Sequence, residues 1–173
     1  MSVADYGLGS RFGSSPPHEL WPRGLLIWRG WQSCPVVIGW RQLLGADDGC
    51  QLRPGAGPDE VAAAEAALEA VFPAELKELY LASDGVFDAP GQGFVIWPLE
   101  MLVEENVQRR QAGVLPADLI AFGDDGAGDP FCVPQDGGDG VFFWDAIDGE
   151  ATRLANSVAT FWSGWVADTL PPH

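Results

Sequence analysis

The sequence predicts an α+β fold, in which a single domain has a mostly antiparallel twisted sheet with helices packed on one side of the sheet and at its end. Two patterns support this prediction. Residues 58–80 and 157–170 place apolar residues at helical spacing, whereas most of residues 93–144 consists of short apolar runs separated by Gly- and Asp-rich stretches. We expect residues 23–173 to form the domain. Residues 1–22, rich in Gly, Ser and Pro, are expected to form a disordered or loosely attached arm.

Three helices are predicted in the first half of the domain. A short helix should run through Trp40 and Leu44 and pack on the rest of the domain. A second should begin at Pro58, because proline at the first helical position loses no hydrogen bond. Pro73 should end that helix and open a third, which Gly85 should end in a left-handed conformation. The apolar stripes of the second and third helices are Val61, Ala64, Leu68 and Phe72, then Leu76, Leu79 and Tyr80.

A strand and a helix should follow. Residues 93–97 are a short apolar run, which predicts a strand, and Pro98 should open a helix. The next run, residues 119–122, is a candidate for a buried strand, and the chain must turn over residues 123–128. The apolar face of the helix should consist of Leu99, Leu102, Val103 and Val107, with Glu104 and Glu105 on its exposed side.

A hairpin and a helix should complete the domain. Residues 131–133 and 141–144 are apolar and flank the Gly- and Asp-rich residues 135–140, a pattern typical of two strands joined by a loop. The last helix should begin after Ser157, whose hydroxyl is suited to cap it. Its apolar face should consist of Val158, Phe161, Trp162, Trp165, Val166 and Leu170.

The charge of the chain is strongly negative. Nine basic residues stand against 25 acidic ones, giving a formal net charge of −16, and Lys77 is the only lysine. Because nucleic-acid affinity comes largely from basic side chains that displace counterions, we expect no binding to DNA or RNA. The charge suits a basic protein partner, since a negative potential accelerates encounter with a positive surface. The alternative explanation is that the negative charge only keeps the protein soluble.

The cysteines and the apolar segments exclude several further classes. Cys34, Cys50 and Cys132 are widely spaced, form no CxxC motif and have no histidine nearby, which argues against a disulfide framework and against a zinc site. The apolar run at residues 25–28 is too short for a signal peptide or a membrane span. We therefore expect a cytoplasmic protein that does not bind membranes.

Catalytic motifs are missing from the sequence. Histidine, the usual general base near neutral pH, occurs only as His18, within the predicted arm, and as His173. The sequence has no GxSxG, no P-loop and no GxGxxG in a βαβ context. We expect a protein that is not an enzyme. A carboxylate-dependent hydrolase stays open as an alternative, because 25 acidic residues always offer some pair at a suitable separation.

The densest acidic cluster is Asp124, Asp125 and Asp129, around two glycines. Hard cations take several oxygen ligands in a loop bent by glycine, so the cluster is a candidate for a divalent cation. Its spacing differs from that of an EF-hand, however, and no glutamate closes the loop. We favour a turn in which the aspartates accept hydrogen bonds from nearby backbone amides, and we expect no metal and no cofactor.

Acidic residues in the predicted loops and on one helix face are the candidates for binding a partner. Recognition residues usually lie on loops that a rigid scaffold positions. Two tryptophans are candidate anchors if they are exposed, with burial in the core as the alternative. The acidic candidates are Asp84, Asp88, Glu104, Glu105, Asp124, Asp125, Asp136 and Asp139, and the tryptophans are Trp97 and Trp144.

The order of these motifs resembles the SMI1/KNR4 superfamily, also called SUKH, over residues 40–170. The matching segments are residues 52–55, 72–80, 83–85, 122–129 and 140–145. The resemblance implies an SMI1/KNR4-like fold. It also implies a role like that of the bacterial immunity proteins that bind and neutralise a cognate polymorphic toxin, often a nuclease, whereas fungal members resemble regulatory interaction hubs. The chain departs from the family at residues 134–136, where many relatives carry Asp directly after the strand. We expect a monomer or weak dimer that binds the basic surface of a toxin domain, with an intracellular regulatory or scaffold protein as the alternative.

Overall fold

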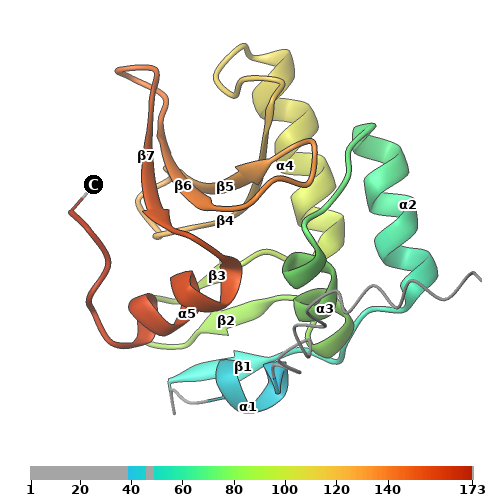
Figure 1. Cartoon of the computed structure of the whole chain (residues 1–173), viewed down its shortest axis with the longest axis vertical. Helices are drawn as coiled ribbons and strands as arrows, with labels where there is room; N and C mark the ends of the chain where they lie inside the picture. Colours follow the sequence, from blue (N-terminus) through green and yellow to red (C-terminus); the bar gives the residue numbers. More distant parts are fainter. Residues whose placement is uncertain (1–38, 46–48, 173) are drawn as a thin grey trace, which may run out of the picture. The chain divides into compact units, whose positions relative to one another are not determined.

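The computed structural model describes residues 39–45 and 49–172 (Figure 1). The predicted arm at residues 1–22, and Cys34, lie outside these residues. The described elements are α1 (Trp40–Leu44), β1 (Cys50–Leu52), α2 (Pro58–Leu68), α3 (Ala74–Ala82), β2 (Val86–Asp88), β3 (Gly93–Ile96), α4 (Leu99–Gln111), β4 (Leu119–Asp124), β5 (Pro130–Pro134), β6 (Val141–Asp145), β7 (Glu150–Ala155) and α5 (Val158–Val166).

The strands form two antiparallel sheets. One has the order β1-β2-β3 and the other the order β4-β5-β6-β7. The α+β class and the antiparallel pairing are confirmed, as is the hairpin of β5 and β6, in which Phe131 pairs with Phe143 and Cys132 with Phe142. The sequence predicted a single sheet, because two short strands of the smaller sheet, β1 and β2, carry no pattern long enough to detect.

The two sheets meet where β3 approaches β4. The Trp97 amide donates a hydrogen bond of 2.9 Å to the Phe122 carbonyl. Beside it, Gly123 lies so close to β3 that a Cβ atom there would overlap the carbonyl oxygen of Val95. Close approach of the two backbones therefore requires glycine at this position.

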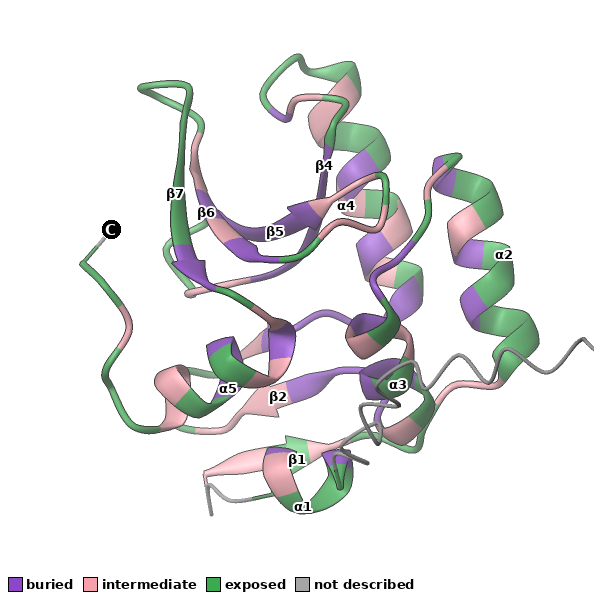
Figure 2. Cartoon of the chain, viewed as in Figure 1, coloured by how far each residue is buried: buried purple, intermediate pink, exposed green. Residues whose placement is uncertain are grey.

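The helices cover the larger sheet on one side and at its end, as predicted. α4 packs against β4, and α2 packs against α4 (Figure 1). α5 packs against β7 and α3. The buried faces of these helices point toward the sheets, while their outer faces are exposed (Figure 2). One hydrophobic core therefore joins both sheets to the helices.

α2 and α3 end earlier than the sequence predicts. α2 ends at Leu68 because Glu69 adopts a left-handed conformation with φ of 50°. Phe72 lies beyond the helix, yet it is buried, and its amide donates to Glu65 Oε1 at 2.7 Å. α3 ends at Ala82, and Gly85 has the expected positive φ, 99°, but precedes β2 instead of ending the helix.

The buried face of α4 includes a polar residue that the sequence analysis missed. Leu99 and Leu102 are buried as predicted, but Val107 is 38% exposed and the next buried position is Asn106. Its side-chain amide donates to the carbonyls of Leu102 and Ala121, both at 2.7 Å, and its Oδ1 accepts from the Ala121 amide at 3.0 Å. Asn106 thus pairs with both the amide and the carbonyl of Ala121 in β4.

The last helix begins where predicted, and the first three residues of its predicted apolar face are buried. Ser157 caps α5, and its Oγ accepts a hydrogen bond of 3.2 Å from the Thr160 amide. Val158, Phe161 and Trp162 are buried, whereas Leu170 lies beyond the end of the helix. β7, directly before α5, was not predicted, because its first four residues are exposed and show no alternation.

None of the helices within residues 39–45 and 49–172 combines the length and the apolar character that crossing a membrane would require.

Tyr80 should make the stability of the domain sensitive to alkaline pH. The side chain is fully buried, and its hydroxyl donates to the Trp97 carbonyl at 2.9 Å. Burial, together with the nearby charge of Asp84, raises the pKa of Tyr80 well above its ordinary value of 10.0. The unfolded chain binds fewer protons than the folded one above about pH 10, so the contribution of Tyr80 is fully present below that pH and is lost as pH rises further.

Tyr80→Phe is the test of this expectation. At neutral pH it should cost about 1 to 2 kcal/mol, because the Trp97 carbonyl loses its donor. Above about pH 10 the variant should lose stability with pH less steeply than the parent, by up to about 1.4 kcal/mol per pH unit. Urea denaturation between neutral and strongly alkaline pH measures both effects. Equal slopes for the two proteins would contradict the assignment.

Candidate functional site

The predicted carboxylates are distributed over separate parts of the surface. Asp84 lines one hollow with Glu60 and Glu100. Asp136 lines another with Glu69 and Asp118. A third hollow contains Asp88, Asp124 and Asp125, so only three of the eight acidic candidates converge.

We call the third hollow the acid hollow. It is lined by Asp88 from β2, by Asp124 and Asp125 from the end of β4, and by the aromatic residues Phe94 and Trp165. Its volume is about 40 Å³, comparable with the space of one water molecule in the liquid. Pockets for small-molecule ligands hold roughly 300 to 1,000 Å³. The acid hollow therefore has room for the tip of a side chain but not for a metabolite.

Local hydrogen bonds fix the carboxylates of the acid hollow. Asp124 Oδ1 accepts from the Gly126 amide and Asp125 Oδ1 from the Ala127 amide, both at 2.8 Å, which confirms the predicted aspartate turn. Asp88 Oδ2 accepts from the Gly91 amide at 3.0 Å. Within the described part of the chain, Asp88 Oδ1 and Asp125 Oδ2 accept no hydrogen bond, and neither carboxylate forms an ion pair. These two oxygen atoms are available to a partner.

Trp97 supports the acid hollow from inside the protein. The side chain is fully buried, so of the two alternatives for Trp97, an exposed anchor or burial in the core, the structure confirms burial. Its indole N–H donates to Asp124 Oδ2 at 3.2 Å. Burial follows from its position directly after β3, where the chain enters the contact between the two sheets.

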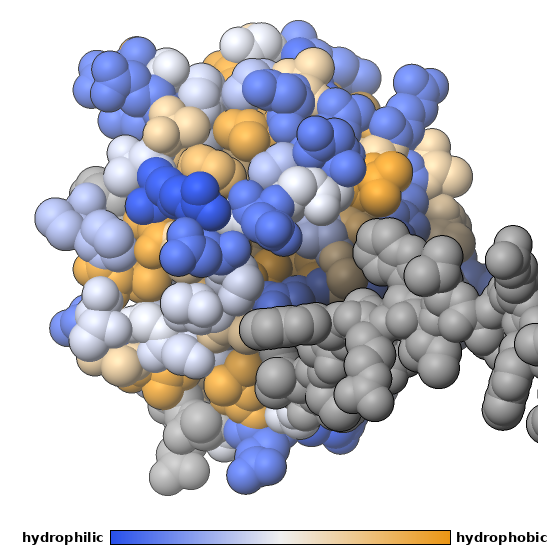
Figure 3. Space-filling view, in the orientation of Figure 1, coloured by the Kyte–Doolittle hydropathy of each residue, from blue (hydrophilic) through white to orange (hydrophobic). Residues whose placement is uncertain are grey.

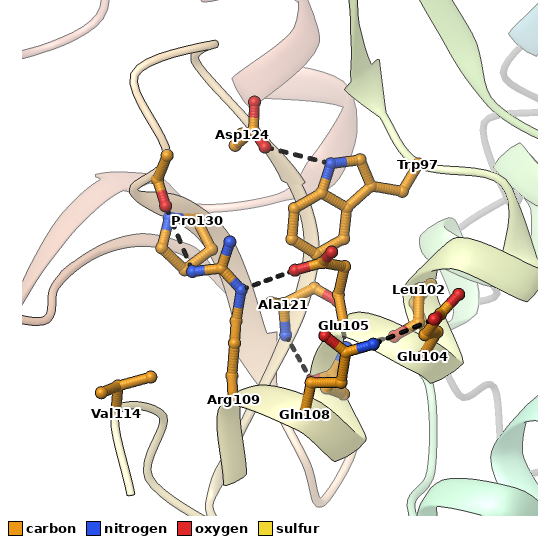
Figure 4. Close-up of polar contacts among 12 residues, drawn as sticks. Trp97, Leu102, Glu104, Glu105, Gln108, Arg109, Val114, Ala121, Asp124 and Pro130 are labelled. Atoms are coloured by element: carbon orange, nitrogen blue, oxygen red, sulfur yellow. Dashed lines mark hydrogen bonds and ion pairs between the residues drawn. The ribbon is translucent and has the colours of Figure 1, made fainter. Parts of the chain in front are cut away.

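Arg109 links α4 to the loop that follows the acid hollow (Figure 4). Its guanidinium lies 5.5 Å from the centroid of the Trp97 ring and forms an ion pair of 3.1 Å with Glu105. Nη1 of the same side chain donates to the Gly128 carbonyl at 3.1 Å. Glu105 is therefore occupied by an internal partner, and the Arg109 side chain holds the loop after Asp125 in place.

Other predicted residues have structural roles. Asp84 Oδ1 accepts from the Leu99 amide at 2.8 Å, where it satisfies the first turn of α4, and Oδ2 lies 3.6 Å from Arg53. Trp144 is half-buried, and its indole donates to the Val114 carbonyl at 2.7 Å. Both residues make internal contacts, and their part in binding stays a prediction.

Three predicted residues remain exposed and apart from the acid hollow. Glu104 accepts a hydrogen bond of 2.9 Å from Gln108, its neighbour one turn along α4. Asp136 accepts from the Gly138 amide within the loop between β5 and β6, and Asp139 is exposed in the same loop. Their part in binding stays a prediction.

Two residues of the site have roles that the sequence does not predict. Trp165 was assigned to the buried face of the last helix, but it is half-buried and lines the acid hollow, with its ring 5.4 Å from that of Phe131. Arg109 stands four residues after Glu105, a spacing that indicates a helical ion pair. Its reach to Gly128 depends on the tertiary fold and had no signal in the sequence.

The Cys132 thiol is buried. Burial raises the pKa of the Cys132 thiol well above its ordinary value, although the Arg109 charge opposes the shift, so the thiol stays protonated near neutral pH. No group of three His, Cys, Asp or Glu side chains in residues 39–45 and 49–172 is arranged to hold a metal ion. His18 and His173 lie outside these ranges.

The fold and the acid hollow together define an acidic α+β domain with an aspartate-lined recess at the junction of its two sheets. The model of the SMI1 / KNR4 family (SUKH-1) matches residues 55–164, which is well over half of the chain. The chain belongs to this family, as its motifs predicted. A comparison with curated proteins found no match.

Proposed function

We propose that this chain is an immunity protein that binds and neutralises a cognate toxin, without catalysing a reaction, by covering the basic active-site surface of the toxin. The observation that carries the proposal is the acid hollow in a member of the SMI1/KNR4 family, where Asp88 and Asp125 each present a carboxylate oxygen without an internal partner.

The chemistry of the acid hollow favours a cationic side chain of the partner. A guanidinium or ammonium group would meet the two available carboxylate oxygens, and the rings of Phe94 and Trp165 line the same hollow. The net charge of −16 would attract a basic surface from a distance. A nuclease has such a surface because its substrate carries phosphates, so the acidic protein would imitate the charge of that substrate.

Two further observations support binding without catalysis. The acid hollow, at about 40 Å³, is too small for a typical substrate, although the hollows beside Asp136 and Asp84 hold about 430 and 500 Å³, within the range of ligand pockets. Of the two described cysteines, Cys132 is buried and Cys50 is half-buried; Tyr80 is buried as well, and burial raises the pKa of both Cys132 and Tyr80.

The proposal is tested by expressing the chain with the product of the neighbouring gene. If the neighbour encodes a secreted protein with a toxin domain, that domain should arrest growth alone, and co-expression of this chain should restore growth and yield a stable complex. A toxin that stays active in the presence of the chain would reject the immunity role. A stable complex with a neighbour that is not a toxin would instead favour a regulatory or scaffold protein. Reproducible turnover by the purified chain, abolished by one carboxylate substitution, would reject the absence of catalysis.

Neutralising the acid hollow should slow association with a basic partner. In the double variant Asp88→Asn and Asp125→Asn, the association rate at low ionic strength should fall about tenfold, and its dependence on salt should become flatter. Stopped-flow or surface-based kinetics at several salt concentrations measure both effects.

The matched control is Asp59→Asn with Asp168→Asn. It removes the same amount of charge from exposed positions that do not line the acid hollow. If the two double variants slow association equally, the effect belongs to the net charge, and the acid hollow is not the contact.

A further inference from the structure

The outer edge of the larger sheet is open at β7. At the opposite edge, Trp97 and Asn106 satisfy the main chain of β4, through the Phe122 carbonyl and both polar groups of Ala121. β7 is the last strand at its own edge, and residues 150–153 are exposed (Figure 2). Among the described residues, no main-chain hydrogen bond reaches residues 150–153 from outside the sheet. β7 can therefore accept a further strand.

The usual defences of an edge strand are weak in β7. Natural edge strands are often protected by proline, by a bulge or by charged side chains that project across the edge. β7 contains no proline, and its one bulge, between Arg153 and Ala155, lies at the end of the strand next to α5 and leaves the pairing of residues 150–152 regular. Its one basic side chain, Arg153, folds back over the Phe142 ring, 5.7 Å from the centroid, and donates to the Ala155 carbonyl. The cation therefore leaves the edge uncovered.

An apolar side chain stands next to this edge. Ile147, in the turn between β6 and β7, is 94% exposed. The turn is fixed because Asp145 Oδ1 accepts from the amides of Ile147 and Asp148, at 2.7 and 3.0 Å. Because burial of an exposed apolar side chain is favourable, Ile147 offers an anchor to a partner that covers this turn.

The charge around β7 selects the occupant. Asp145, Asp148 and Glu150 flank Ile147, against the single cation of Arg153. A second copy of the chain would bring another net charge of −16 to the same edge and would be repelled. Among the described residues visible in Figure 3, hydrophobic residues are scattered among hydrophilic ones and form no broad apolar patch. A basic, extended segment of another protein fits these features.

We infer that β7 is a strand-addition site, at which a basic extended segment of a partner protein pairs with residues 150–153 and covers Ile147. The inference rests on the proposed function as a binding protein and adds a second contact region to the acid hollow. Main-chain hydrogen bonds along β7 would supply affinity, and the acidic residues of the turn would select lysine and arginine in the partner.

The test uses the full chain and a short synthetic peptide in which lysine alternates with valine. Its control is the same peptide with N-methyl groups on alternate amides, which keeps every charge but cannot pair along one edge. The unmodified peptide should shift the amide NMR signals of residues 150–153 and bind about tenfold more tightly, because the control loses at least one to two main-chain hydrogen bonds.

Protein variants separate the anchor from general charge attraction. Ile147→Ser should weaken binding of the unmodified peptide several-fold, whereas Leu81→Ser, at another exposed apolar residue, should leave it unchanged. Equal affinity for the two peptides, signal changes confined to the acid hollow, or no binding would overturn the inference. If the chain neutralises its toxin but binds the two peptides equally, the proposed function stands and the strand-addition site is rejected.

Discussion

Gly123→Ala is expected to destabilise the domain by about 3 kcal/mol or more. The new methyl group would overlap the Val95 carbonyl oxygen and would approach the Val95 carbonyl carbon to 2.9 Å and the Ile96 Cα to 3.3 Å. All three atoms belong to the backbone, so a change of side-chain rotamer cannot relieve the overlap. β3 would have to separate from β4, which would weaken the adjoining hydrogen bond between Trp97 and Phe122.

Urea denaturation measures this effect, and Gly93→Ala is its matched control. Gly93 lies in β3, and a Cβ atom there would meet no atom within 4 Å. The control should therefore remain within about 0.5 kcal/mol of the parent protein. If Gly123→Ala is as stable as the control, the two sheets do not approach as closely as described.

Asn106→Leu is expected to cost about 3 kcal/mol or more. The substitution keeps the number and branching of the side-chain heavy atoms, with bulkier methyl groups, but removes the two donors and the acceptor. The amide and the carbonyl of Ala121 would then be buried without partners, at a cost of roughly 1 to 3 kcal/mol each. The loss should appear as a lower urea midpoint.

The control for this variant is Gln108→Leu, the same kind of change at an exposed position of α4. It removes only the exposed hydrogen bond to Glu104 and should change stability by no more than about 0.5 kcal/mol. Similar losses for both variants would mean that the cost comes from helix composition and not from the contact with β4.

The sequence predicted those elements in which burial follows a long, regular pattern. α5 presents Val158, Phe161 and Trp162 to the core at helical spacing, and the hairpin of β5 and β6 has two apolar runs around a Gly-rich loop. β1 and β2 have three residues each, and the first four residues of β7 are exposed, so none of them carries a periodic signal. The buried position of Asn106 was not predicted, because the apolar spacing identifies only hydrophobic residues as buried.

The candidate site was predictable only where it depends on local structure. The turn at Asp124 and Asp125 follows from side-chain bonds to amides two residues away. The approach of Asp88 to this turn depends on how one sheet is placed against the other, which no local pattern encodes. For the same reason, the sequence could not distinguish the buried Trp97 from an exposed anchor.

The turn after Asp125 can change in length without affecting the core. Residues 126–128 are exposed, and although the positive φ of Gly126 and Gly128, 85° and 109°, would strain a substituted side chain, no atom lies within 4 Å of a Cβ at either position, so added residues would meet no part of the core. Insertions in this turn would therefore leave the core intact while altering what stands beside the two available carboxylate oxygens. Related chains could acquire different partners by lengthening one short loop on an otherwise constant framework.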